Sequence, residues 1–146
     1  MNGPVSERGS RSLQIVGAGL LGTSIGLALA GTGWRVRVAD ADAAAQRLAA
    51  ELGAGEEGWC STDPDLVLLC IPPGKVRLVM EQVIRLFPTS TISDVSSVKT
   101  EPEGHAETLD CLSRFVGGHP MAGRERSGAV AAQADLFDAR PWASCP

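Results

Sequence analysis

The sequence is poor in the residue types that build metal sites and disulfide frameworks. It holds only 2 histidines and 4 cysteines among 146 residues. The cysteines form no CxxC pair and no cluster with histidine; they are Cys60, Cys70, Cys111 and Cys145. This scatter excludes the usual zinc spacings and the disulfide scaffold of a small secreted domain. We therefore expect no metal, and reduced, mostly structural thiols in a cytoplasmic protein.

The sequence also lacks an excess of positive charge. Its formal net charge is -4, with 21% charged and 44% hydrophobic residues, a composition typical of a soluble globular protein without a basic nucleic-acid surface. The apolar run LQIVGAGLLGTSIGLALAG follows two arginines, as in a signal peptide, but its regular glycines and the strand-like WRVRVAD behind it favour a cytoplasmic location. We expect neither nucleic acid nor a membrane as a partner.

What the chain does have is an alternation of strand-like and helix-like segments. Strands are predicted at 13–16, 34–40, 65–71, 91–95 and 114–118, and helices at 20–30, 41–52, 75–87 and 101–112. Such alternation implies parallel strands joined by helical crossovers, hence an α/β doubly wound sheet. Residues 1–12 are polar and predicted to be a flexible tail, and residues 13–146 are predicted to form one domain.

Two details refine this fold prediction. The segment 53–64 is short where a doubly wound domain often has a further strand and helix, so the third βα unit is predicted to be abbreviated. Arg35 and Arg37 alternate with apolar residues, whereas a strand buried on both faces is apolar throughout. The strand 34–40 is therefore expected close to the sheet edge.

The first turn carries the strongest motif. Gly17, Gly19 and Gly22 have the G-x-G-x-x-G spacing between a predicted strand and a predicted helix, which is typical of a Rossmann-type dinucleotide-binding domain. Gly17 permits a tight turn, Gly19 lets a pyrophosphate approach the backbone, and Gly22 with Gly26 lets the helix pack close to the sheet. The glycines could instead serve packing alone.

The start of this helix and the ends of two strands complete the expected cofactor site. The first helical residues, Leu20 and Leu21, offer free N–H groups to the phosphates. Ile71 and Pro72 end the buried strand and are expected to contact the cofactor.

Asp40 ends the second predicted strand, about 20 residues beyond the glycines. Its carboxylate is expected to accept hydrogen bonds from the adenosine ribose and to repel a 2′-phosphate, which predicts NAD rather than NADP. The neighbouring Asp42 points the same way. The alternative for Asp40 is the N-cap of helix 41–52, a role compatible with ribose binding.

The loop SDVSSVKT follows a further strand. Because ligands of open α/β sheets lie at the carboxyl ends of the strands, Ser96, Ser97 and Lys99 should face the same crevice as the glycine loop. The hydroxyls can contact a substrate alcohol or the nicotinamide amide, and Lys99 can attract an anionic substrate. By spacing alone, the favoured alternative is a helix N-terminus at Glu101 capped by Ser97 or Thr100.

His119 stands in the turn-rich stretch GGHPMAGRERSG, after the last predicted strand. A neutral imidazole there can take the proton of an alcohol while a hydride leaves the same carbon, and Pro120 can hold the ring in place. A loop histidine taken alone is more often structural; its predicted position beside a nicotinamide makes it a catalytic candidate. His105, between Glu103 and Glu107, is predicted to be a surface residue.

Five segments, in this order, resemble the prephenate dehydrogenase family: VGAGLLGTSIGLAL, DLVLLCIPP, SDVSSVKT, GGHPMAGRERSG and ADLFDARPW. Many dehydrogenases share the glycine loop, whereas D-x-x-S-x-K followed by H-P-M-A-G-x-E-x-S-G is far more specific. The resemblance implies NAD-dependent oxidative decarboxylation of prephenate to 4-hydroxyphenylpyruvate in tyrosine biosynthesis. It also implies that His119 takes up the proton of the C4 hydroxyl and that Ser97 approaches that hydroxyl, with Ser96, Lys99 and Gly123 in the substrate loops.

The resemblance covers only the cofactor-binding part of such an enzyme. Family members continue beyond the equivalent of Pro146 into a largely helical domain that pairs the subunits as a homodimer and contributes an arginine to the substrate carboxylate. With that helical C-terminal domain absent from these residues, the chain is expected to bind NAD but to turn over prephenate poorly. The alternatives are arogenate or amino-prephenate as substrate, another dehydrogenase of β-hydroxyacid type, and a non-catalytic NAD-binding fragment.

Overall fold

The computed structural model describes residues 10–97, 100–120, 128–139 and 142–145. The strands are β1 (Ser12–Val16), β2 (Arg35–Ala39), β3 (Glu56–Glu57), β4 (Leu66–Leu69), β5 (Thr91–Asp94), β6 (Phe115–Pro120) and β7 (Trp142–Cys145). The α-helices are α1 (Leu20–Leu29), α2 (Ala43–Glu51), α3 (Val76–Leu86) and α4 (Thr100–Thr108). Single 3-10 turns stand at η1 (Pro73–Lys75), η2 (Leu112–Arg114) and η3 (Ala129–Ala131).

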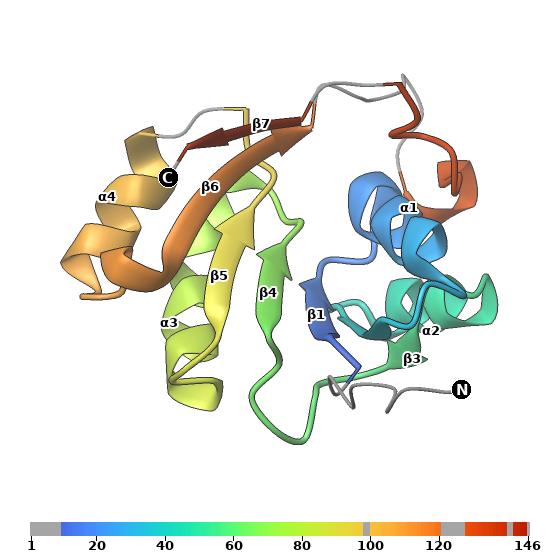
Figure 1. The fold of residues 1–146 in the computed structure, drawn as a ribbon, viewed down its shortest axis with the longest axis horizontal. Coiled ribbons are helices and arrows are strands. Elements are labelled where there is room, and N and C mark those ends of the chain that lie inside the picture. Colours follow the sequence, from blue (N-terminus) through green and yellow to red (C-terminus); the bar gives the residue numbers. More distant parts are fainter. Residues whose placement is uncertain (1–9, 98–99, 121–127, 140–141, 146) are drawn as a thin grey trace, which may run out of the picture.

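Within these described residues the strands form one sheet in the order β3-β2-β1-β4-β5-β6-β7. Every neighbouring pair from β3 to β6 is parallel, and only β7 runs antiparallel to its neighbour β6. The order reverses between β1 and β4, which is the point where open α/β sheets bind ligands. The predicted doubly wound fold is therefore confirmed (Figure 1).

Two apolar clusters hold the helices to the sheet. One joins β4 and β5 to α3 and α4 through residues such as Leu69, Met80 and Ala106. The other joins β1 and β2 to α1 and α2 through residues such as Ile15, Ile25 and Ala49. Leu68 belongs to the second cluster although its neighbour Leu69 belongs to the first, because successive side chains of a strand point to opposite faces. The continuous apolar strands of the sequence follow from this two-sided burial.

The third βα unit is abbreviated, as predicted. The segment predicted as a linker contains a strand of two residues, β3, and no helix stands between β3 and β4. The strand β2 is second from the edge, which confirms its predicted position near the edge. Arg35 is exposed, and the Arg37 guanidinium lies 3.2 Å from the Glu56 carboxylate. A Cβ on Gly26 would lie 2.1 Å from the Ala54 carbonyl oxygen, so this glycine lets α1 approach the loop before β3 rather than the sheet.

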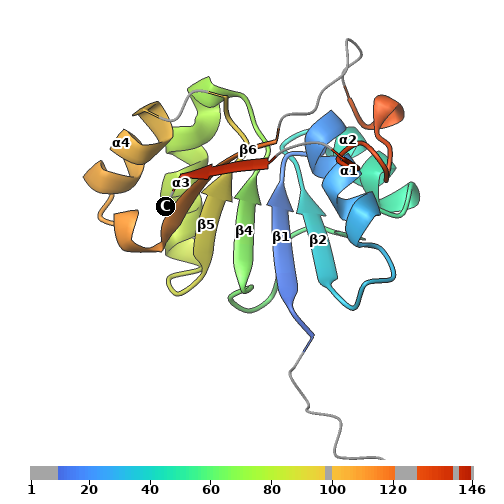
Figure 2. The same ribbon diagram turned by 45° about the horizontal axis from the view of Figure 1, so that its top comes forward.

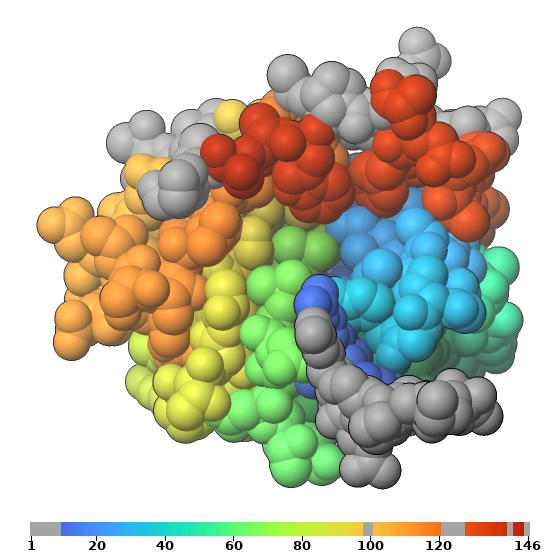
Figure 3. Space-filling model, in the orientation of Figure 1, coloured from blue at the N-terminus to red at the C-terminus, as the bar shows by residue number. Residues whose placement is uncertain are grey.

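The strand β7 was not predicted. Before reaching it, residues 128–139 cross to α1, where Ala129 and Leu136 are buried and the Gln133 N–H donates to Ser24 Oγ at 3.0 Å (Figure 3). The chain then returns and pairs with the end of β6, Gly118 opposite Ser144. Among the described helices, none is both long and apolar enough to cross a lipid bilayer.

Candidate functional site

Parallel pairing brings the candidate residues to one edge of the sheet. The glycine loop follows β1, Asp40 follows β2, Ile71 and Pro72 follow β4, and the serine loop follows β5. The strand β6, whose last residues include His119, ends at the same side of the sheet (Figure 2). We call the ends of β1, β2 and β4 the cofactor side and the ends of β5 and β6 the histidine side.

The glycine loop is packed against the end of β4. Gly17 has φ 109°, a conformation that side chains rarely adopt. A Cβ on Gly17 would lie 2.1 Å from the carbonyl oxygen of Cys70, and a Cβ on Gly22 would lie 2.0 Å from the carbonyl oxygen of Gly17. The predicted tight turn at Gly17 and the close approach at Gly22 are both present. They fix the start of α1 against β1 and β4.

The residue between these two glycines faces open space. A Cβ on Gly19 would meet nothing within 4 Å. Gly19 is also the N-cap of α1 and makes no side-chain cap, so the amides of Leu20, Leu21 and Gly22 begin the helix without intrahelical acceptors. Uncapped amides and the positive end of the helix dipole favour a phosphate at this position. The loop thus fits the pyrophosphate of a dinucleotide.

Asp40 is tied to the glycine loop. Its Oδ2 accepts from the Ala18 N–H at 2.7 Å, and its Oδ1 accepts from the Asp42 N–H at 2.8 Å. The N-cap of α2 is Asp42, whose Oδ1 accepts from the N–H groups of Ala44 and Ala45. The alternative assignment of Asp40 as the helix cap is therefore wrong, because the cap lies two residues later, at Asp42. Asp40 instead lines the crevice described next.

A crevice of about 400 Å³ opens on the cofactor side. Of the predicted residues it is lined by Gly17, Gly19, Asp40, Ile71 and Pro72. The lining residues that sequence reasoning missed are Val16, Ala39, Ala41, Trp59, Cys70, Lys75, Val79 and Gln82. Several directly flank predicted residues at strand ends, whereas Trp59 comes from the abbreviated unit and carried no sequence signal.

Cys70 is one of the residues that line this crevice. Burial raises the pKa of its thiol, and the nearby Asp94 carboxylate raises it further. The thiol is therefore neutral and unreactive near pH 7, since the thiolate is the nucleophilic form. This agrees with the structural role expected for the cysteines.

The histidine side is organised around Asp94, the last residue of β5. Asp94 is fully buried, and its carboxylate accepts from the Ser96 N–H at 3.1 Å and from the Gly118 N–H at 3.2 Å. One side chain thus joins the serine loop to the strand that carries His119. Ser97 is exposed, whereas Ser96 is buried and its Oγ has no hydrogen-bond partner among the described residues.

His119 lies within β6 rather than in a loop, which corrects the predicted strand end at 118. The strand extends to Pro120 because β7 pairs with its last residues, His119 opposite Ala143 and Pro120 opposite Trp142. The imidazole is half-buried. Neither His119 nor the two serines line the crevice of the cofactor side.

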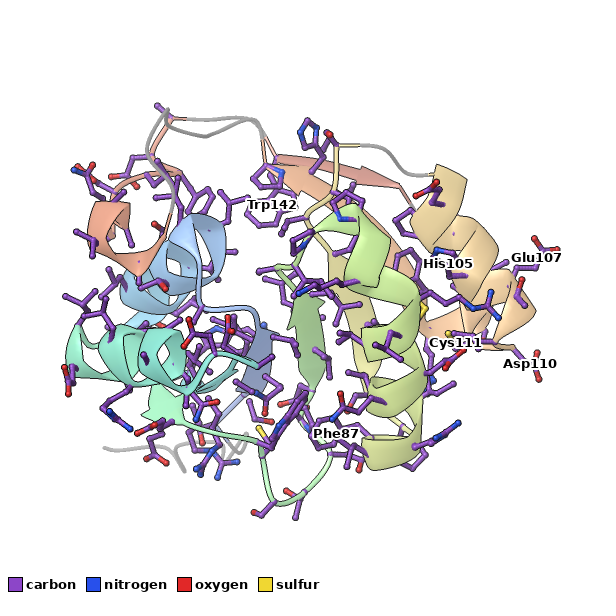
Figure 4. The ribbon with its side chains drawn as sticks, turned by 180° about the vertical axis from the view of Figure 1, so that it is seen from behind. Phe87, His105, Glu107, Asp110, Cys111 and Trp142 are labelled. Carbon is purple, nitrogen blue, oxygen red and sulfur yellow. The ribbon has the colours of Figure 1, made fainter. Side chains whose placement is uncertain are left out.

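Other residues singled out in the sequence do not belong to either side of the site as the structure describes it. Lys99 and Gly123 lie outside the described residues. The helix α4 includes Thr100, one residue before the predicted start at Glu101, so Thr100 is a helical residue rather than the predicted cap. His105 is half-buried on α4, while Glu107 is exposed and points away from the molecule (Figure 4). In the part of the chain that the structure describes, no group of three or more His, Cys, Asp and Glu residues could hold a metal ion.

Comparison with known proteins agrees with this geometry. Residues 25–146 match the family model of the prephenate dehydrogenase nucleotide-binding domain. The probable prephenate dehydrogenase NovF of Streptomyces niveus is 39% identical over 137 residues, which cover 93% of this chain and 38% of that protein.

Solved structures give the same result. Prephenate dehydrogenase from A. aeolicus, in complex with hydroxyphenyl propionate and NAD+, has a TM-score of 0.83 at 28% identity, covering 93% of this chain and 50% of that one. Synechocystis arogenate dehydrogenase has a TM-score of 0.84 at 29% identity, covering 92% and 50%. The chain therefore spans half or less of the length of these relatives. It belongs to the prephenate dehydrogenase family, of which it forms the nucleotide-binding domain.

Proposed function

We propose that this chain is the NAD-binding and proton-accepting part of a cytoplasmic enzyme that oxidatively decarboxylates prephenate to 4-hydroxyphenylpyruvate. The observation that carries the proposal is the shared edge of the sheet. There, an uncapped helix start and Asp40 adjoin a crevice, and Asp94 joins the serine loop to the strand of His119.

The cofactor side is assigned to the dinucleotide. The N–H groups at the start of α1 bind the pyrophosphate, and the space above Gly19 admits it. The Asp40 carboxylate accepts hydrogen bonds from the adenosine ribose and disfavours a 2′-phosphate, so NAD is the proposed cofactor. When bound, NAD accepts a hydride from the carbon that carries the substrate hydroxyl.

The histidine side is assigned to the substrate. His119 accepts the proton of the C4 hydroxyl as the hydride leaves C4, and the C4–O bond becomes a carbonyl. Breaking the bond between the ring and its carboxylate then releases carbon dioxide. The electron pair of that bond makes the ring aromatic, and the former carbonyl oxygen takes up a proton as a phenol. Ser97 hydrogen-bonds the reacting hydroxyl, with Ser96, Lys99 and Gly123 in the substrate loops.

Arogenate is the second candidate substrate. It differs from prephenate in the side chain rather than at the reacting C4, so the chemistry proposed for His119 serves both. The similarity to an arogenate dehydrogenase structure, with a TM-score of 0.84, supports arogenate as the second candidate. Parallel assays with the two compounds distinguish them.

The cofactor assignment is tested by calorimetric titration. We expect NAD to bind the chain more tightly than NADP, because a 2′-phosphate beside the Asp40 carboxylate brings two negative charges together. In Asp40→Asn, the preference for NAD should shrink. Tighter binding of NADP by the unmodified chain contradicts the assignment.

The catalytic assignment is tested with His119→Asn. Where the unmodified sequence is part of an active enzyme, prephenate-dependent NADH formation should fall by about two to four orders of magnitude, since a general base contributes a factor of that size. NAD affinity should stay nearly unchanged. His105→Asn, on α4, is the matched control and should keep the original rate. Unaltered turnover in His119→Asn refutes the role. An unmodified chain that binds NAD but oxidises neither compound by itself matches the poor turnover expected without the helical domain, so the role of His119 is judged where the unmodified sequence is active.

A further inference from the structure

Gln14 is an amide buried in the middle of β1, a central strand of the sheet. It has no exposed surface, and polar residues are rare in parallel strands covered on both faces. It stands opposite Arg37 on β2 and Val67 on β4. Val67 belongs to the cluster on the α3 face, so Gln14 points to the face over which the abbreviated unit runs.

The Gln14 amide holds both peptide groups that flank Trp59. Its Oε1 accepts from the Cys60 N–H at 2.7 Å, and its Nε2 donates to the Gly58 carbonyl at 3.2 Å. Nε2 also lies 3.0 Å from the Ile15 carbonyl and 3.4 Å from the Arg37 carbonyl, so its two protons are shared among three acceptors. One side chain thus supplies the donor and the acceptor that a neighbouring parallel strand would present to Trp59.

A further bond anchors this segment to β2, from the Gly58 N–H to the Val38 carbonyl at 2.8 Å. The Trp59 ring is only partly buried and packs against Phe87, with ring centroids 6.2 Å apart and planes tilted by 41°. Trp59 also lines the crevice of the cofactor side, together with Asp40 and Val79. An aromatic residue and the carboxylate proposed to bind the ribose therefore share one crevice.

We propose that Trp59 is the surface on which the adenine ring packs, and that Gln14 is the positioning residue that holds it there. The inference rests on the proposed binding of NAD. With the adenosine ribose at Asp40, the base attached to that ribose lies in the same crevice. Packing of a purine on an aromatic side chain adds about 1 to 3 kcal/mol to the binding free energy. Trp59 therefore strengthens binding without contacting the nicotinamide.

The test uses ADP-ribose, which contains the adenosine and pyrophosphate but no nicotinamide. Calorimetry should show ADP-ribose binding about tenfold more weakly to Trp59→Ala than to the unmodified chain, and Trp59→Phe should keep most of the affinity. Trp34→Phe is the matched control. Trp34 lies beside Arg11, just before the start of β2 and thus at the other end of the strands, and this variant should bind ADP-ribose normally.

Fluorescence gives a readout that a purely structural role would not change. In the Trp34→Phe, Trp142→Phe double variant, Trp59 is the single tryptophan, and ADP-ribose should quench its emission. In this background, Gln14→Met should shift the emission to longer wavelength and weaken ADP-ribose binding. Gln14→Glu keeps the acceptor for the Cys60 N–H and should retain part of the affinity. Hydrogen exchange of the Cys60 amide in the unmodified chain tests its bond to Gln14 without any substitution, and this exchange should be slow.

The outcomes separate the two proposals. ADP-ribose that binds Trp59→Ala within about twofold of normal, or that leaves Trp59 emission unchanged, overturns the role of Trp59 while NAD binding stands. A rapidly exchanging Cys60 amide, or normal binding and emission in both Gln14 variants, overturns the role of Gln14. If the unmodified chain binds neither NAD nor ADP-ribose, the proposed function fails and this inference fails with it.

Discussion

The two sides of the candidate site are held in place by different means. On the cofactor side, backbone lies directly on backbone: a methyl group on Gly17 or Gly22 would collide with a carbonyl oxygen. On the histidine side, one buried carboxylate, Asp94, bonds to the N–H groups of Ser96 and Gly118. At Gly17 and Gly22 the first arrangement leaves no room for an added methyl group, whereas the second depends on the charge and acceptors of a single side chain.

The largest effect is expected from Gly22→Ala. Its Cβ would lie 2.0 Å from the Gly17 carbonyl oxygen. Both groups belong to the main chain, so neither can move aside as a flexible side chain could. We expect a loss of more than about 4 kcal/mol in the free energy of unfolding, measured by urea denaturation. The matched variant is Gly19→Ala, whose methyl group meets open space.

Gly19→Ala should change stability by less than about 1 kcal/mol, yet weaken NAD binding because the methyl group occupies the approach of the pyrophosphate. Equal stability of the two alanine variants would remove the distinction between packing and ligand approach in this loop.

A smaller effect is expected from Asp94→Asn. The new amide keeps one acceptor but turns N–H protons toward a backbone N–H, so a buried donor loses its partner. Denaturation should show a loss of about 2 kcal/mol, and turnover should fall more than NAD affinity does. Asp138→Asn, at an exposed position, is the control and should be neutral. A neutral Asp94→Asn would mean that other contacts hold the histidine side.

The smallest effect is expected from Asp42→Ala, which removes the cap of α2. The loss should be about 1 kcal/mol, visible in the Tm. The preference for NAD over NADP should stay the same, because Asp42 caps α2 and does not line the crevice, contrary to its expected contribution to that preference. Asp42→Asn retains the capping oxygen and should lose less. A changed cofactor preference in Asp42→Ala would show that ribose recognition extends beyond Asp40.

Local patterns predicted most of the fold. The apolar runs and their glycine or proline ends located β1, β2, β4, β5 and the four helices, because these signals lie within a few neighbouring residues. The glycine spacing likewise predicted the turn at Gly17 and the open position at Gly19.

Contacts between distant segments could not be predicted in this way. The Gln14 side chain meets the Cys60 N–H across 46 positions of sequence, and the neighbouring Trp59 lines the crevice. The strand β7 forms because its residues reach β6 after the chain has crossed to α1. Neither event leaves a periodic pattern, since the partners are remote in sequence.

The short strand β3 has a consequence for association between molecules. It forms one edge of the sheet, and it consists of Glu56 and Glu57, both exposed. Edge strands expose unpaired N–H and C=O groups on which another chain can add a strand, and proteins counter this with short, charged edges. An edge of two glutamates leaves too little backbone and too much charge for such pairing, so the abbreviated unit also protects the sheet from aggregation.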